Sequence, residues 1–294
     1  MAESPMLKIP DHFPIEFGRN WEHVLQTMES IAAACATPET VNGEKKSFNQ
    51  LGPKMMQPIT QRLQPTRIEE PTTFKRWLTK HGHDCVDFFD HFDDDFLGHI
   101  SLPNSEVIQS HAMAHNRAMD AVIFEAALGE AMTGKNGTDL VALPSSQIIP
   151  ANFGGPQSGM TLAKLIATKS MFGKNRVPQQ ETVYLFLSQQ QIDDLLNYEQ
   201  LTSADYAAVR ALVDGQISRF MGMEFRVTED LPVVSGVRQC IAWVKSGMKY
   251  NSSGRSAFMD RRPDITQALQ VQTLALLGAS RTDEKKVVMI GCDE

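Results

Sequence analysis

The stretch between Asn104 and Gly134 constrains the fold of this chain more than any other. It runs for about 29 residues without proline, and Gly129 is the one glycine inside it. Asn104 or Ser105 can cap a helix at its start, and Gly134 is a suitable stop at its end. Apolar residues recur along it at helical spacing. We therefore predict one helix of about 40–45 Å, which is long beside an average helix of about 11–12 residues.

A basic segment and an acidic segment adjoin each other before this helix. Residues 44–80 carry eight Lys or Arg and three Glu, whereas residues 81–99 carry six Asp and no Lys or Arg. The whole chain has a formal net charge of −7, so the chain outside 44–80 has a balance of −12. A basic segment in such an acidic chain needs an acidic counterpart.

The basic segment is also interrupted by prolines. Their spacing forbids a long helix, and they stand at Pro53, Pro58, Pro65 and Pro71. The two flanks, near Lys45–Leu51 and Thr72–Thr79, are expected to pair as an extended hairpin. A segment of this kind cannot bury itself in its own subunit, so we predict a projecting arm or long loop that needs a partner surface.

The remaining elements are short and mixed in type. Asn20 is expected to cap a helix that reaches Cys35. The patterns after the long helix predict helices over 160–172, 188–197 and 202–215, and strands over 182–187, 223–228, 237–244 and 286–291. Helices and strands in this order indicate an α+β fold rather than a regular βαβ repeat.

Composition excludes some classes of protein. An acidic chain is poorly suited to tight wrapping around nucleic acid, which needs a basic surface. The scattered cysteines (Cys35, Cys85, Cys240 and Cys292) suggest a reducing compartment. The first residues lack the pattern of a secretory signal, and no apolar stretch reaches the roughly 18 residues that cross a membrane. We therefore expect no membrane association.

A glycine-rich stretch, residues 154–161, partly matches a phosphate-binding loop. Gly154, Gly159 and Thr161 fit the motif, but Met160 stands where the motif needs a lysine for the phosphates. Pro156 also lacks an amide N–H for a bound phosphate. We interpret the stretch as a turn that leads into a capped helix, with a nucleotide site as a weak alternative.

Residues that could bind a metal form one alternating group. His81, His83 and Cys85 would share a strand face, but no second group of ligands has zinc-site spacing. His111 and His115 share a helix face without the Glu of a zinc-protease motif, and we expect surface or interface histidines. We therefore predict no catalytic residues, no metal and no cofactor.

Several passages along the last 190 residues resemble those of tailed-bacteriophage major capsid proteins with the Hong Kong 97-type fold. No single passage is diagnostic, but their order and spacing together are specific. They are Arg117–Asp120, Ala126–Gly129, Gly159–Leu165, Leu195–Leu196, Thr202–Tyr206, Leu212–Gly215, Phe220–Phe225, Leu231–Pro232, Arg262–Asp264, Gly278–Arg281 and Val287–Asp293. The acidic, histidine-rich stretch 81–99 does not match the family pattern.

The resemblance implies an α+β capsid fold with a defined order of parts. These are an N-terminal arm (1–43), an extended loop that crosses a neighbouring subunit (44–82), a peripheral domain with a long spine helix (83–139), an axial domain (140–262) and a return to the peripheral domain (263–294). It also implies pentamers and hexamers that close into an icosahedral shell around double-stranded DNA. The expected partners are copies of the chain, a scaffolding protein, a portal and a decoration or cement protein, with assembly in the host bacterial cytoplasm.

We expect the basic loop to lie on the acidic surface of a neighbouring copy. The candidate contacts between subunits are Lys45, Lys46, Arg67, Lys75, Arg76, Trp77, Asp84, Asp93, Asp94 and Asp95. On this basis, reversing the charges of Lys75 and Arg76 should hinder assembly and leave the monomer folded.

Two other classes remain as alternatives. An encapsulin-like nanocompartment shell protein would share the fold class, and protein cargo in place of a genome would identify it. A metal-dependent enzyme that uses His81, His83 and Cys85 is a more distant alternative, which metal analysis of the purified protein would test.

Overall fold

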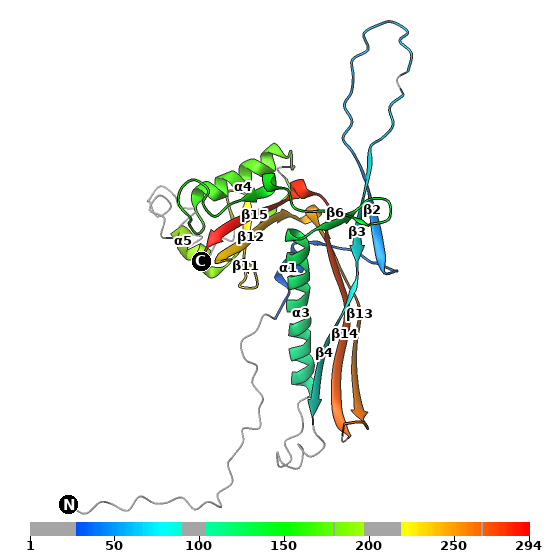
Figure 1. Ribbon diagram of the computed structural model, residues 1–294, viewed down its shortest axis with the longest axis vertical. Helices are drawn as coiled ribbons and strands as arrows, with labels where there is room; N and C mark the ends of the chain where they lie inside the picture. Colours follow the sequence, from blue (N-terminus) through cyan, green and yellow to red (C-terminus); the bar gives the residue numbers. More distant parts are fainter. Residues whose placement is uncertain (1–27, 67, 90–103, 179, 197–218, 266) are drawn as a thin grey trace, which may run out of the picture.

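The computed structural model describes residues 28–66, 68–89, 104–178, 180–196, 219–265 and 267–294. The molecule is elongated, with a helix and a long sheet at one end and a projecting loop at the other (Figure 1). A second sheet, flanked by shorter helices, stands to one side of this axis.

The long helix α3 spans Asn104–Leu128. It is about 37 Å long at 1.5 Å per residue, and it confirms the prediction of one dominant helix. The predicted stop at Gly134 is wrong, because the helix ends five residues earlier at Gly129. The Gly129 N–H still donates to Glu125 O at 2.7 Å, but the chain then turns into strand β5 (Ala131–Thr133). Gly134, at φ +83°, instead begins the turn to β6 (Asp139–Val141).

One face of the long sheet packs against α3. The strand order of this sheet is β1-β13-β14-β4. Its members are β1 (Thr37–Pro38), β13 (Met248–Arg262), β14 (Ala268–Arg281) and β4 (His81–Phe89). The β13–β14 hairpin was not expected from the sequence, because its polar residues hide the alternation that marks a half-buried strand.

The second sheet has seven strands and matches the sequence closely. Its order is β7-β15-β12-β8-β10-β9, with β11 paired to β12. The strands are β7 (Ile148–Ile149), β8 (Val183–Leu187), β9 (Arg219–Phe220), β10 (Met223–Val227), β11 (Val233–Val234), β12 (Val237–Val244) and β15 (Val287–Asp293). The predicted strands in this region are confirmed within one or two residues.

Two of the predicted helices flank this sheet as expected. Thr161 caps α4 (Leu162–Lys174) by accepting from the Lys164 N–H. Ser188 opens α5 (Gln189–Leu196), and its own N–H donates to the Gln191 side chain at 3.2 Å, as a capping box requires. The predicted helix 202–215 lies outside the described residues.

Aromatic side chains in the core join the seven-stranded sheet to helix α3. Trp243 of β12 stacks on Phe186 of β8 with ring centroids 4.1 Å apart, and Phe124 of α3 meets Phe186 edge-on at 5.4 Å. The Trp243 indole donates to Cys35 O at 2.9 Å, just after the short helix α1 (Ile31–Ala34). The predicted helix 20–35 lies mostly outside the described residues. Within them it is wrong for residues 28–30, because Ser30 is extended and its side chain caps the four-residue α1.

A small third sheet forms the base of the projecting loop. Strands β2 (Lys45–Leu51) and β3 (Thr73–Thr79) pair antiparallel, which confirms the predicted hairpin. β3 also pairs with β5, and β5 pairs with β6, so the order of this sheet is β2-β3-β5-β6. Among the described residues, no helix is long and apolar enough to cross a membrane.

The strands of each sheet do not follow the expected domain limits along the chain. β13 ends at Arg262 but belongs to the long sheet with β4, whereas β15 at the C-terminus belongs to the seven-stranded sheet. A division at 262 and 263 would therefore separate β13 from its partner β14. Short 3-10 turns mark these crossings, at Ser145–Gln147 (η1), Lys245–Gly247 (η2) and Glu284–Lys286 (η3).

Candidate inter-subunit interface

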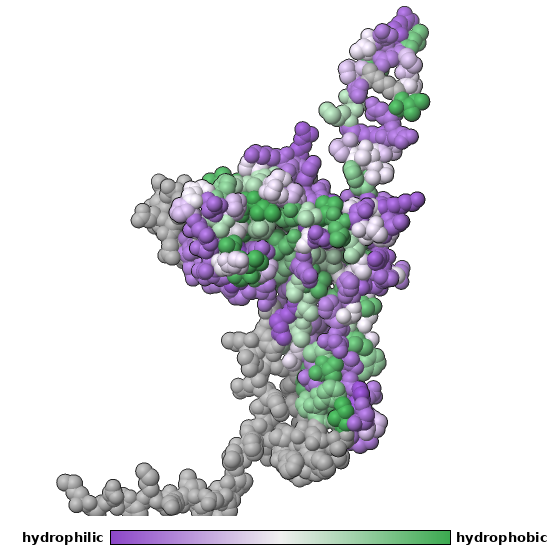
Figure 2. Space-filling view, viewed as in Figure 1, coloured by the Kyte–Doolittle hydropathy of each residue, from purple (hydrophilic) through white to green (hydrophobic). Residues whose placement is uncertain are grey.

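Within the segment 44–82, strands β2 and β3 form the base, and residues 52–72 between them are the extended loop proper. It projects away from the body of the molecule (Figures 1 and 2). Its large apolar side chains are each at least 83% exposed: Met55, Met56, Ile59, Leu63 and Ile68. Single exposed apolar residues are ordinary, but a gathered set of them marks an interaction surface. The loop therefore has the character of a binding segment.

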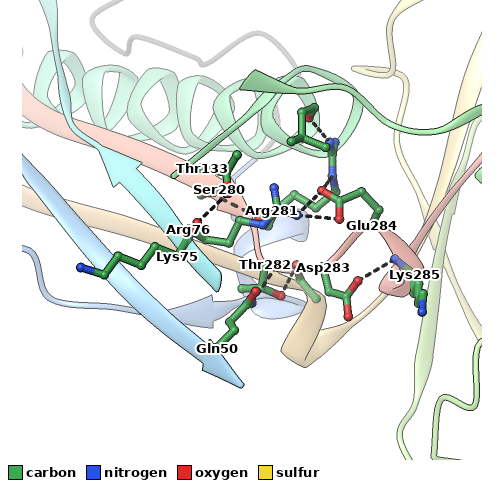
Figure 3. A network of polar contacts seen from close by, with 12 residues as sticks. Gln50, Lys75, Arg76, Thr133, Ser280, Arg281, Thr282, Asp283, Glu284 and Lys285 are labelled. Carbon is green, nitrogen blue, oxygen red and sulfur yellow. Dashed lines mark hydrogen bonds and ion pairs between the residues drawn. The ribbon is translucent and has the colours of Figure 1, made fainter. Parts of the chain in front are cut away.

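The base of the loop is held by two buried arginines (Figure 3). Arg76 of β3 is 9% exposed, and its guanidinium lies 2.6 Å from the Glu284 carboxylate. Arg281 of β14 is fully buried. Its guanidinium donates to Ala127 O at 2.8 Å, Gly129 O at 2.9 Å and Val141 O at 2.9 Å.

Arg281 thereby joins three parts of the molecule. The carbonyls of residues 127 and 129 end helix α3, where the helix dipole is negative and a cation is stabilising. Val141 begins the connection from β6 toward the seven-stranded sheet. Burial lowers the pKa of Arg281, and the nearby Glu284 opposes this shift. Glu284 lies between Arg281 and Arg76, so one carboxylate serves both guanidinium groups.

Trp77 is also engaged inside its own subunit. Its indole N–H donates to Gly134 O at 2.8 Å. Gly137, at φ +73°, packs directly on the indole ring, where a Cβ atom would lie 2.9 Å from the nearest ring carbon. The ring thus fixes the β5–β6 turn against β3.

Other expected contact residues differ in how far they are free for a partner. Lys45 is exposed, whereas Lys46 donates to Glu39 at 2.9 Å. Hydrogen bonds from Lys249 and Lys46 lower the pKa of Glu39. Figure 3 shows the Lys75 side chain pointing away from the buried network. Reversing Arg76 would set a carboxylate against buried Glu284, so of the pair Lys75 and Arg76 only Lys75 suits a charge-reversal test of contacts between copies.

The acidic side of the expected contact is only partly described. Asp84 is exposed on β4, next to the half-buried Cys85. Arg67, Asp93, Asp94 and Asp95 lie outside the described residues.

Helix α3 holds its two histidines against the long sheet. His111 is 2% exposed, with Nδ1 3.0 Å from Thr273 Oγ1 and Nε2 2.9 Å from Asp87 Oδ2. The prediction of a surface or interface residue is therefore wrong for His111. His115 Nε2 lies 3.2 Å from Ser252 Oγ. Burial lowers the pKa of His115, and the charges of Arg255 and His83 add to this effect.

The glycine-rich turn is a structural element, as the sequence predicted. Met160 is 1% exposed and fills the core, and Lys164 is fully buried. The Lys164 ammonium donates to Ser158 O at 2.7 Å, Gly159 O at 2.8 Å and Gly291 O at 2.9 Å. The turn therefore directs carbonyl oxygens at a cation, whereas a phosphate loop directs N–H groups at an anion.

The described residues contain no group of three or more His, Cys, Asp or Glu side chains that could hold a metal ion. His81, His83 and Cys85 do alternate along β4. His83 faces His115 of α3 across the helix–sheet contact, where the two side chains interact electrostatically.

Sequence reasoning missed two sets of residues. Arg281 and Glu284 carry no local signal, because their partners stand more than a hundred residues away in sequence. The exposed face of the long sheet was missed with the β13–β14 hairpin. The available signal was the short apolar run Leu274–Leu277, since a run of this kind is consistent with a strand.

Comparison with known proteins agrees with this architecture. A structure from Mycobacterium phage Che8 is 14% identical, with a TM-score of 0.71 over 96% of this chain and 98% of that chain. The capsid structure of the cyanophage P-SCSP1u is 13% identical, with a TM-score of 0.72 over 97% and 94%. The cyanophage Pam1 capsid is 11% identical, with a TM-score of 0.72 over 100% and 99%.

These likenesses show the fold. No curated protein matches the chain. The sequence model of one family, described as phage capsid protein, matches residues 9–294. The match covers almost the whole chain. The chain therefore belongs to the phage capsid protein family and has the Hong Kong 97-type fold.

Proposed function

We propose that the chain is the major capsid subunit of a tailed double-stranded DNA bacteriophage. Its copies assemble into pentamers and hexamers that close into an icosahedral shell around the genome. The observation that carries this proposal is the extended loop, whose apolar side chains project from the body at least 83% exposed. Such a surface is stable in water when another subunit covers it.

In this proposal the two larger sheets belong to separate functional parts. The long sheet with α3 is the peripheral part, and the seven-stranded sheet with α4 and α5 is the axial part, which meets its copies around the five- and six-fold axes. The proposed N-terminal arm comprises residues 1–43. β13 then counts with the peripheral part and β15 with the axial part, because each pairs within that sheet.

The subunit acts by assembly and performs no catalysis in this proposal, and it needs no cofactor. The net negative charge of the chain suits a shell that encloses DNA without binding it tightly, since tight binding needs a basic surface. A scaffolding protein, a portal and a decoration or cement protein are the proposed partners. Assembly takes place in the host bacterial cytoplasm, and the finished subunit resides in the virion.

Electron microscopy of the purified, overexpressed chain tests this proposal. We expect shells, tubes or rings of subunits, together with fast-sedimenting species in velocity sedimentation. A chain that stays a folded monomer at high concentration, with or without the other head proteins of its phage, would contradict the proposal. DNA rather than protein cargo inside native particles would distinguish a capsid from a nanocompartment shell.

A further inference from the structure

Two Asn–Gly pairs occur in the chain, at Asn42–Gly43 and Asn136–Gly137. An asparagine that precedes a glycine can be converted without an enzyme. The glycine amide nitrogen attacks the side-chain carbonyl carbon of the asparagine, a C–N bond forms, and ammonia leaves. Water then opens the resulting succinimide ring at either of its carbonyls, which gives aspartate or isoaspartate. Glycine hinders this attack least, because it has no Cβ atom.

The attack needs an asparagine side chain that can turn and a glycine N–H that is free, and the first pair supplies both. Asn42 and Gly43 are both exposed. Among the described residues, neither the Asn42 side chain nor the Gly43 N–H makes a hydrogen bond. Beyond its chain neighbours, a Cβ atom built on Gly43 would meet only Lys45 O, at 3.8 Å. The Asn42 side chain can therefore reach the next nitrogen of its own main chain.

The chain on either side of this first pair is held in place by Lys80. The Lys80 ammonium donates to Val41 O at 2.9 Å, and Val41 is buried. The Lys80 main-chain N–H donates to Glu44 O at 3.1 Å. Asn42 and Gly43 are thus the free tip of a turn whose two ends are fixed.

The second pair differs from the first in its packing. Asn136 is exposed, but Gly137 is buried. A Cβ atom on Gly137, which stands at φ +73°, would lie 2.9 Å from the Trp77 ring. The same indole donates to Gly134 O at 2.8 Å. The peptide group that would have to turn toward the Asn136 side chain is therefore held against Trp77.

We propose that Asn42 is a site of spontaneous deamidation, and that Trp77 protects Asn136 from the same reaction in the folded chain. The product carries one added carboxylate, and isoaspartate also adds a carbon atom to the main chain. Both changes fall in the connection from β1, which pairs with β13, to β2, which begins the hairpin of the extended loop. The chain thus acquires a charge and a longer turn at this joint as it ages. This inference does not depend on the proposed function.

Incubation of the purified chain in mildly alkaline buffer tests this proposal. Peptide mass spectrometry at successive times gives the converted fraction of each asparagine. In the folded chain we expect Asn42 to convert at least about tenfold faster than Asn136, because conversion of a packed residue waits for local opening. In the chain unfolded by guanidinium the two rates should be similar, since both asparagines precede a glycine.

Gly43→Ala is the matched variant. It adds one methyl group beside the attacking nitrogen, and the open space at this position predicts a normal thermal midpoint. Conversion of Asn42 should slow severalfold, while conversion of Asn136 stays unchanged.

Three outcomes would overturn the proposal. They are equal rates of the two asparagines in the folded chain, an undiminished rate at Asn42 in Gly43→Ala, and a rate difference that persists in the unfolded chain. The last would show that the local sequence, and not Trp77, protects Asn136. A chain that fails to assemble would contradict the proposed function and leave this inference intact.

Discussion

Individual buried cations hold this fold together at its turns. Lys164 has no exposed surface, and three main-chain carbonyls accept its hydrogen bonds. Burial lowers the pKa of its ammonium group, while the thiols of Cys292 and Cys240 and the carboxyl of Asp194 oppose this. One side chain thus fixes the glycine-rich turn to the C-terminal strand β15.

Removing this ammonium group should weaken the whole domain. Lys164→Met keeps the length of the side chain but removes the shared donor of three carbonyls. Ser158 O still accepts from the Asp293 N–H, whereas each carbonyl left unsatisfied costs about 1–3 kcal/mol. We expect a loss of about 3–5 kcal/mol in the free energy of unfolding, measured by denaturant titration. Lys169→Met on the exposed side of the same helix is the control, and an equal effect of both would show that Lys164 is not specially held.

His115 should make the stability of the helix–sheet contact depend on pH. Its pKa in the folded chain lies below the ordinary value of 6.5, because of burial and of Arg255 and His83 nearby. The unfolded chain therefore takes up this proton first as pH falls, so stability is present above pH 6.5 and is lost below it.

Replacing His115 by Gln should reduce this loss. The fall in thermal midpoint of the unassembled chain between pH 7.5 and pH 5.5 should be smaller in this variant than in the wild-type chain, because glutamine takes up no proton. His81→Gln on the exposed end of β4 is the matched control. An unchanged pH profile in His115→Gln would remove this histidine as a cause.

At the level of elements, a close approach of strands β3 and β14 holds the base of the extended loop against the long sheet. A Cβ atom built on Gly278 of β14 would lie 2.2 Å from Thr79 O of β3. Only a glycine lets the base of the hairpin pack this closely on the long sheet. The passage Gly278–Arg281, noted from the sequence, therefore has two structural roles, the close approach and the buried guanidinium.

Gly278→Ala should displace the hairpin from the sheet. Overpacking of this kind costs about 1–3 kcal/mol, and amide exchange in β2 and β3 should become faster than in β12. Gly82→Ala in the neighbouring strand is the control, because a Cβ atom there meets nothing within 4 Å. Equal exchange in both variants would contradict the proposed close approach.

Local signals predicted the elements of the seven-stranded sheet better than those of the long sheet. Strand β12, for example, follows the turn at Gly236 and contains the apolar run Cys240–Val244, and its limits were predicted without error. β13 is polar over most of its length, and its partner β14 determines its conformation. The predicted end of α3 was misplaced for a related reason. Gly129 and Gly134 are equally good helix stops by sequence alone. The pairing of β5 with β3 and β6 decides that the helix ends at Gly129.

At the scale of the whole molecule, Arg281 connects the parts that must keep a fixed relation in a shell. Its three carbonyl partners belong to the end of α3 and to the strand that leads to the seven-stranded sheet. The joint lies directly below the extended loop, because Glu284 also holds Arg76.

Arg281→Met should loosen this joint. Losing a buried, hydrogen-bonded charge costs about 3–5 kcal/mol, and it should broaden the range of particle shapes seen by electron microscopy if the chain still assembles. Arg261→Met, at the exposed end of β13, serves for comparison. A normal thermal midpoint and uniform particles in Arg281→Met would show that the joint is held by other contacts.

The sequence alone determined the long helix, the hairpin at the base of the loop, four strands of the seven-stranded sheet and the family resemblance. These depend on capping residues, on periodicity and on the order of short passages, all of which are local. Only the tertiary structure decided which charges are available to a neighbour. Arg76 and Arg281 resemble surface cations in the sequence, yet burial beside Glu284 engages both within the subunit. Burial depends on strands brought together from distant positions, so no local pattern reports it.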